Sequence, residues 1–215
     1  MPELNMAIRF IRGIKMPIVT LIRHAETTYN ASKIFAGRID CELSEKGIRD
    51  TKNKFNYQKE DFDIYYCSPL KRSIDTLNLM IEGIDKINID NRIIEISIGD
   101  WEGKSKETLP QDLLANYRKG IYTPLHAETI KEVDERVSSF ILELFDLFDD
   151  DTKILVITHN GVMRSIKRNF VPDYENIMSS NLETIVLDRK NYTYYLNNKK
   201  EKTHKKILLN RNGTL

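Results

Sequence analysis

The chain has 215 residues, of which 40% are hydrophobic and 30% are charged, and its formal net charge is +1. This length and composition are typical of a globular protein that can bury a full hydrophobic core. A nearly neutral charge gives no reason to expect nucleic acid or a membrane as a partner, and no apolar stretch reaches the roughly 20 residues of a transmembrane helix. Two cysteines, Cys41 and Cys67, are too few for a disulfide framework, so we expect reduced thiols and a cytoplasmic protein.

Short apolar runs rich in β-branched residues predict the buried strands of a parallel sheet. In chain order, these runs lie at Ile18–Arg23, Asp63–Cys67, Lys153–Thr158, Thr184–Asp188 and Tyr192–Leu196. Helical patterns fill the gaps, from Ser44 to about Asn56, from Pro69 to about Glu82, and over Thr129–Phe148 and Gly161–Phe170. The alternation of strands and helices predicts a three-layer α/β/α sandwich with a mostly parallel central sheet.

We expect a single domain over residues 16–198. Residues 1–15 alternate apolar and basic side chains and are interpreted as an extension. Residues 199–215 begin with a basic run, which predicts a solvated tail. The stretch at about 103–128 is interrupted by glycine and proline, which predicts a short lid insertion.

Two histidines directly follow predicted strands, His24 after Arg23 and His159 after Thr158. In open α/β sheets, ligands bind outside the carboxyl ends of the strands. A neutral imidazole can attack phosphorus and form a phosphohistidine, and the planar fork of an arginine such as Arg23 matches phosphoryl oxygens. His159 could donate to a phosphoryl oxygen as negative charge spreads in the transition state. Each histidine could also be structural.

Two further residues fit the same chemistry. Arg72 falls in the first turn of the helix after the second strand, where free amide hydrogens and the helix dipole favour an anion. Glu95 lies among isoleucines, and apolar surroundings favour the protonated carboxyl group that a general acid needs. Asp100 and Glu102 are alternatives for this role. Asn30 could donate to phosphate or cap a turn.

The sequence carries none of the common metal or nucleotide motifs. It contains no Cys-x-x-Cys and no histidine pair at the i, i+4 spacing of a helical zinc site. Its glycines match neither a Walker loop nor a dinucleotide fingerprint. We therefore expect no metal and no cofactor.

Four motifs in this order resemble the histidine phosphatase superfamily, also called the phosphoglycerate mutase-like family. The motifs are Leu21–Thr27, Ser68–Arg72, Glu95–Gly103 and Thr158–Gly161. The resemblance implies that His24 is the phosphorylated nucleophile and that Glu95 takes the acid/base position. It also implies that the phosphate pocket is completed by Arg23, Arg72 and His159.

The chain departs from the family pattern at two positions, because Ala25 and Ala127 stand where the family usually has glycine. The segment Gly99–Gly103 resembles the phosphatase branch of the family, whereas Phe35–Asp40 and Tyr117–Lys119 resemble the mutases. A mutase must keep its intermediate away from water beneath a large lid. Because the lid expected here is short, we favour hydrolysis.

The resemblance thus implies a metal-independent phosphomonoester phosphatase, acting on a small phosphorylated metabolite through a phosphohistidine. The alternatives are a phosphoglycerate mutase-type phosphotransferase and a non-catalytic phospholigand-binding protein. A homodimer is one of the oligomeric states that the sequence allows. Substrate-binding residues are expected at Asn30, Gly37, Tyr117, Arg118 and His126.

Overall fold

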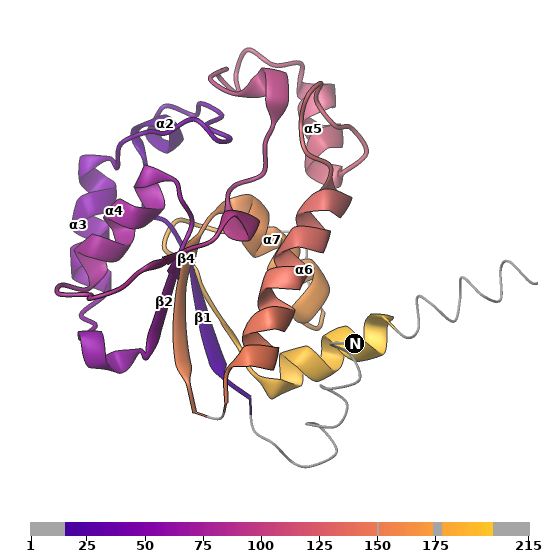
Figure 1. Cartoon of the computed structure of the whole chain (residues 1–215). Helices are drawn as coiled ribbons and strands as arrows, with labels where there is room; N and C mark the ends of the chain where they lie inside the picture. Colours follow the sequence, from indigo (N-terminus) through magenta and orange to yellow (C-terminus); the bar gives the residue numbers. More distant parts are fainter. Residues whose placement is uncertain (1–15, 150, 174–177, 200–215) are drawn as a thin grey trace, which may run out of the picture.

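The computed structural model describes residues 16–149, 151–173 and 178–199, with helices on both faces of a central sheet (Figure 1). Within these residues the strands are β1 (Ile18–Arg23), β2 (Ile64–Cys67), β3 (Asn88–Ile89), β4 (Lys153–Thr158) and β5 (Thr184–Leu187). They form one sheet in the order β3-β2-β4-β1-β5, in which β5 alone runs antiparallel to its neighbour. The predicted α/β/α sandwich with a mostly parallel sheet is confirmed. The predicted extension over residues 1–15 lies outside the described residues, as does the tail from residue 200 onwards.

The two central strands set the position of both histidines. Strands β1 and β4 pair in parallel along their whole length, ending with Arg23 opposite Thr158. Their apolar side chains are buried on both faces, as their uninterrupted apolar runs predict. Because the two strands end in register, His24 and His159 emerge next to each other at the same edge of the sheet. The backbone N–H of His24 donates to the Thr158 carbonyl at 2.8 Å.

The helices have the following bounds: α2 (Thr28–Ala31), α3 (Glu45–Lys54), α4 (Lys71–Met80), α5 (Gln111–Lys119), α6 (Ile130–Leu147) and α7 (Asn160–Phe170). Three short 3-10 helices are η1 (Lys59–Asp61), η2 (Asn91–Ile93) and η3 (Gly99–Trp101). Helices α6 and α7 cover one face of the sheet over a core that includes Phe140, and α3 and α4 cover the other over a core that includes Leu77 (Figure 1). None of the helices in the described part of the chain is long and apolar enough to cross a membrane.

The prediction of a strand at Tyr192–Leu196 is wrong, because residues 189–199 form a helix. Tyr192 and Tyr195 are three residues apart and both buried, which places them on one face of this helix. The ring of Tyr195 stacks on Phe170 of α7, with 4.6 Å between the ring centroids. The aromatic content of this segment favours a strand, but the packing of its two tyrosine rings favours a helix.

The predicted insertion at 103–128 contains a helix, α5, where no clear periodicity was expected. Gly120 ends this helix in a left-handed conformation with φ of +74°. Leu114 of α5 packs with Ile98 and Trp101 in a small apolar cluster of its own. The insertion is therefore a packed element that lies beyond the carboxyl ends of the strands (Figure 1).

Candidate active site

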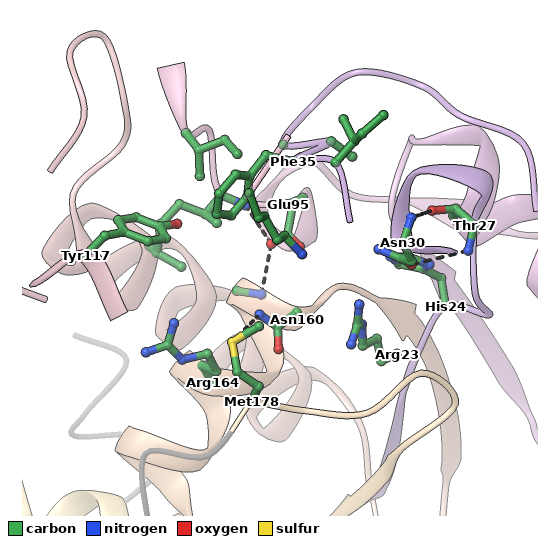
Figure 2. A pocket seen from close by; sticks show the side chains of 18 of the residues that line it. Arg23, His24, Thr27, Asn30, Phe35, Glu95, Tyr117, Asn160, Arg164 and Met178 are labelled. Carbon is green, nitrogen blue, oxygen red and sulfur yellow. Dashed lines mark hydrogen bonds between the residues drawn. The ribbon is translucent and has the colours of Figure 1, made fainter. Parts of the chain in front are cut away.

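A cavity of about 130 Å³ lies between the carboxyl ends of the strands and α5. Figure 2 shows Arg23 and His24 on one side of this cavity and Tyr117 and Arg164 on the other, with Glu95 between them. The predicted site residues that line the cavity are Arg23, His24, Asn30, Gly37, Arg72, Glu95 and Tyr117. The fold therefore brings most of the predicted site into one place.

The ring of His24 is held in a single tautomer. Its Nδ1 atom lies 2.7 Å from the carbonyl oxygen of Ala25. Because a carbonyl only accepts hydrogen bonds, Nδ1 carries the proton and Nε2 carries a lone pair. Burial, together with the positive charges of Arg23 and Arg72, holds the pKa of His24 well below its usual value. The ring is therefore neutral, with a nucleophilic nitrogen.

Ala25 is compatible with this arrangement. The residue is fully buried, and it is absent from the described residues that have a positive φ. Its methyl group therefore introduces no backbone strain at this position, although the family usually has glycine there. Its backbone N–H donates to the Thr76 hydroxyl at 3.0 Å.

Two guanidinium groups stand beside His24 without a carboxylate partner. Arg72, which is only 1% exposed, donates to the carbonyls of Ile39 at 2.8 Å and Gly37 at 2.7 Å. Arg23 donates to the carbonyl of Ser179. Within the described residues these carbonyls are their hydrogen-bond acceptors, and the Nε atom of each arginine has no partner. Because buried positive charge is costly without a counter-ion, the site fits an anion such as a phosphoryl group.

His159 lies next to His24, with 5.1 Å between the two ring centroids. Its Nε2 atom is 2.6 Å from the Ser68 hydroxyl and 3.3 Å from the Ser73 hydroxyl, and Nδ1 has no partner among the described residues. Burial and the neighbouring positive charge of Arg72 hold the pKa of His159 well below its usual value. When Nε2 accepts from a serine hydroxyl, Nδ1 carries the proton. His159 is fully buried and is not among the residues that line the cavity, so the structure places it beside His24 but not at the cavity wall.

Glu95 is anchored through one of its carboxylate oxygens. Its Oε1 atom accepts from the backbone N–H groups of Ile96 and Gly161, both at 2.9 Å. No described residue hydrogen-bonds Oε2, so this oxygen can exchange a proton with a ligand. A methyl group at Gly161 would lie 2.5 Å from Oε1, so the close approach of the carboxylate requires glycine at this position.

Asn30 presents its amide N–H₂ group to a ligand. Its Oδ1 atom accepts from the N–H of Thr27 and from the side chain of Asn181, both at 3.2 Å. The amide of Asn181 also donates to the carbonyl of His24 at 3.0 Å. Asn181 thus connects the backbone of the nucleophile with Asn30.

The remaining predicted substrate-binding residues are placed differently from one another. Gly37 has a positive φ of +52°, and its carbonyl holds Arg72. Tyr117 lies at the far side of the cavity, where burial and the charge of Glu95 raise its pKa. Arg118 belongs to α5, but its side chain lies outside the described part of the structure.

The expectation that His126 binds substrate is not supported by the geometry. Its side chain is 82% exposed, and it is not among the residues that line the cavity. The residue has a φ of +59°, and its Nδ1 atom pairs with Asp100 at 2.9 Å. The imidazole of His126 therefore lies outside the cavity. The side chain of Glu128, two residues later, is by contrast largely buried.

Comparison with known proteins agrees with this geometry. Residues 19–198 match the family described as the histidine phosphatase superfamily (branch 1). This chain belongs to the histidine phosphatase superfamily.

The similar proteins include both phosphatases and mutases. The adenosylcobalamin/α-ribazole phosphatase of Salmonella typhimurium is 31% identical over 150 residues, which cover 66% of this chain and 74% of that protein. The putative phosphoserine phosphatase 2 of Hydrogenobacter thermophilus is 29% identical and covers 68% of this chain and 74% of its own length. The phosphoglycerate mutase of Thermus thermophilus has a similar structure, with a TM-score of 0.64 at 22% identity over 80% of this chain and 93% of that one.

Sequence reasoning missed several residues of this protein that line the cavity, namely Phe35, Asn160, Arg164, Arg168 and Met178. Asn160, Arg164 and Arg168 are spaced four residues apart on α7, so helical spacing from the histidine motif could have found them. Arg168 is neutralised by Asp134, with two hydrogen bonds of 2.6 and 3.0 Å. Phe35 and Met178 stand in loops, where no periodicity points to them.

Proposed function

We propose that this protein is a metal-independent phosphomonoesterase that hydrolyses a small phosphate ester through a phosphohistidine at His24. The observation that carries the proposal is the neutral His24 ring, with its Nε2 lone pair, beside the guanidinium groups of Arg23 and Arg72. These two groups supply fixed positive charge for the phosphoryl oxygens. The similarity to proteins named as phosphatases over about two thirds of the chain supports a phosphatase.

In the first step, Nε2 of His24 attacks the phosphorus, a P–N bond forms, and the P–O bond to the leaving group breaks. Oε2 of Glu95 donates its proton to the leaving oxygen, so that the alcohol departs neutral. Arg23 and Arg72 bind the phosphoryl oxygens while this bond exchange takes place. Their charges are in place beforehand, so they need no reorganisation during the reaction.

In the second step, a water molecule occupies the place that the alcohol has left. The carboxylate of Glu95 removes a proton from the water, whose oxygen then bonds to phosphorus. The P–N bond breaks, and its electron pair returns to Nε2 of His24. The amide of Asn30, which lines the cavity, donates to the phosphoryl oxygens in both steps. His159 lies beside His24 but is not among the residues that line the cavity, so its donation to a phosphoryl oxygen stays a prediction from the sequence.

Hydrolysis is favoured over transfer by the size of the insertion. A mutase must shield its phosphohistidine from water until the second acceptor is in place. Here the insertion at 103–128 contributes one helix of nine residues, α5, above the cavity. A cover of this size fits an enzyme that admits water.

The test measures phosphate release from p-nitrophenyl phosphate and a panel of metabolite phosphate esters, with EDTA present throughout. It compares the wild type with His24→Ala and with His126→Ala, a matched histidine variant outside the cavity. We expect the wild type and His126→Ala to release phosphate, and His24→Ala to be slower by on the order of 10⁴-fold. Rapid quenching should trap an acid-labile phosphoenzyme in the wild type and none in His24→Ala.

Each other outcome has a definite meaning. Wild-type rates in His24→Ala would exclude His24 as the nucleophile, and activity that EDTA abolishes would exclude a metal-independent enzyme. Transfer to a phosphoglycerate in excess of phosphate release would identify a phosphotransferase. Binding of vanadate without turnover of any ester would identify a phospholigand-binding protein.

A further inference from the structure

Glu95 lies on a segment without regular secondary structure, and its side chain is anchored to α7 through the N–H of Gly161. Residues 95–98 connect η2 with η3 and have no regular secondary structure. A general acid must lie within hydrogen-bond reach of the leaving oxygen, and a displacement of about 1 Å can cost about 100-fold in rate. The position of Glu95 therefore depends on the side chains that bind this segment.

Two arginines bind the backbone on either side of Glu95. Nε of Arg38 donates to the carbonyl of Glu95 itself at 3.0 Å. Arg136 of α6 donates through one nitrogen to the carbonyls of Arg92 at 2.6 Å and Ile94 at 2.8 Å. Each guanidinium group thus contacts the segment through a backbone oxygen, independently of the side chains that the segment carries.

Both arginines are held by one carboxylate, that of Glu128. Arg136 donates to its two oxygens at 2.6 and 2.9 Å, and Arg38 donates to Oε2 at 3.1 Å. The Glu128 side chain is 13% exposed and that of Arg136 is 16% exposed, so water competes little for this pair. The backbone N–H of Glu128 also donates to the carbonyl of Ser97 at 2.9 Å, which fixes the other end of the segment.

We propose that Glu128 is a positioning residue for the general acid: its carboxylate orients Arg38 and Arg136, which fix the backbone that presents Glu95. This inference rests on the proposed function, because it assumes that Glu95 protonates the leaving oxygen. Glu128 itself is not among the residues that line the cavity. It therefore acts through Glu95 and not on the substrate.

The experiment uses the dependence of kcat/KM on the leaving group. An acidic phenol such as p-nitrophenol leaves without a proton, whereas phenol itself needs general-acid assistance. A series of aryl phosphates therefore reports the placement of Glu95 through the slope of log kcat/KM against the pKa of the phenol. A purely structural defect lowers all members of the series alike and leaves this slope unchanged.

We expect Glu128→Gln to lower kcat/KM for phenyl phosphate by about 10- to 100-fold while p-nitrophenyl phosphate changes little. Glu95→Gln should steepen the slope at least as much. The matched control is Glu132→Gln, because Glu132 lies at the same helix start but accepts only from Thr129, at 2.7 Å. This control should keep the wild-type slope. Arg38→Met, a change at a half-exposed side chain, should steepen the slope even where Glu128→Gln does not fold.

A wild-type slope in both Glu128→Gln and Arg38→Met, with a steepened slope in Glu95→Gln, overturns this inference and leaves the proposed function intact. A wild-type slope in Glu95→Gln removes the general acid, and the inference fails with it. A wild type that hydrolyses none of the esters contradicts the proposed function itself.

Discussion

A single carbonyl group determines which nitrogen of His24 carries the lone pair that the proposed reaction uses. The Ala25 carbonyl accepts from Nδ1, so the proton stays on the side of the ring that faces the protein. The same ring is buried beside Arg23 and Arg72, and both effects oppose its protonation. At the residue scale, the neutral tautomer that the proposed nucleophile requires is therefore already present in the folded protein.

This arrangement predicts the protonation state of His24 as a function of pH. Because its pKa is held well below the usual 6.5, the folded ring stays neutral as the pH falls through that value and takes up a proton only at lower pH. We expect ¹⁵N NMR of the ring nitrogens to show a protonated Nδ1 and an unprotonated Nε2 at pH 6.5. His24→Asn assigns the resonances. A His24 ring that titrates near its usual pKa would contradict the prediction.

At the scale of elements, the start of α7 is built around the carboxylate of Glu95. His159 caps this helix, and the N–H of Gly161 in its first turn donates to Oε1 of Glu95. The motif that contributes the second histidine therefore also holds the acid/base residue.

Gly161→Ala should disturb this contact without unfolding the helix. The added methyl group would lie 2.5 Å from Oε1 of Glu95 and 2.6 Å from Cγ2 of Ile96. We expect kcat to fall by about 100-fold, as measured by steady-state kinetics, while circular dichroism stays that of the wild type. Gly83→Ala is the control for activity: its φ of +70° strains the backbone and lowers stability, but a methyl group there meets no atom within 4 Å and Gly83 does not line the cavity, so kcat should stay that of the wild type. Equal kcat values in the two variants would contradict the role of this contact.

Sequence patterns predict the residues around His24 better than the substrate-binding residues on the other side of the cavity. His24 and His159 follow long apolar runs, and such runs predict both the strands and the edge at which they end. Asn181 is an isolated asparagine in a loop, where no periodicity indicates a contact with Asn30. His126 is only two residues from the buried Glu128, but it has a positive φ and its side chain is exposed.

Element boundaries show the same contrast. The predicted strand Lys153–Thr158 coincides with β4. Its continuous apolar run shows no helical periodicity that would have favoured a different element. Helix α5 was not predicted within the insertion, because Pro110 and Gly120 at the two ends of this nine-residue helix are typical of loops. The tyrosines of Tyr192–Leu196 fit a strand by composition, and only the packing of Tyr195 on Phe170 identifies the helix.

At the scale of the whole molecule, the buried positive charge of the site makes stability depend on a bound anion. Arg72 is almost completely buried, and its acceptors among the described residues are neutral carbonyls. A ligand that binds only the folded state stabilises it by RT ln(1 + L/Kd), where L is the concentration of free ligand. An oxyanion should therefore raise the free energy of unfolding of this protein.

Vanadate should raise the melting temperature of the wild type, with a gain of about 2.7 kcal/mol at 100 times its dissociation constant. Arg72→Met should lose most of this increase, because it removes a charge that binds the anion. Arg49→Met is the matched control, since Arg49 lies on the surface and, in the part of the chain that the structure describes, pairs with Glu45 alone, at 3.7 Å. Differential scanning calorimetry measures both shifts. An equal vanadate effect in Arg72→Met and the wild type would place the anion elsewhere.

The in-register pairing of β1 with β4 separates the reaction from the choice of substrate. Two adjacent strand ends hold His24 and His159, whereas α5 contributes to the far side of the cavity together with residues of α6 and α7. The length and composition of residues 103–128 can therefore diverge among descendants of this chain while the phosphate pocket is inherited unchanged. We expect that exchanging residues 103–128 between relatives changes which phosphate ester is preferred and leaves the proposed nucleophile, His24, in place.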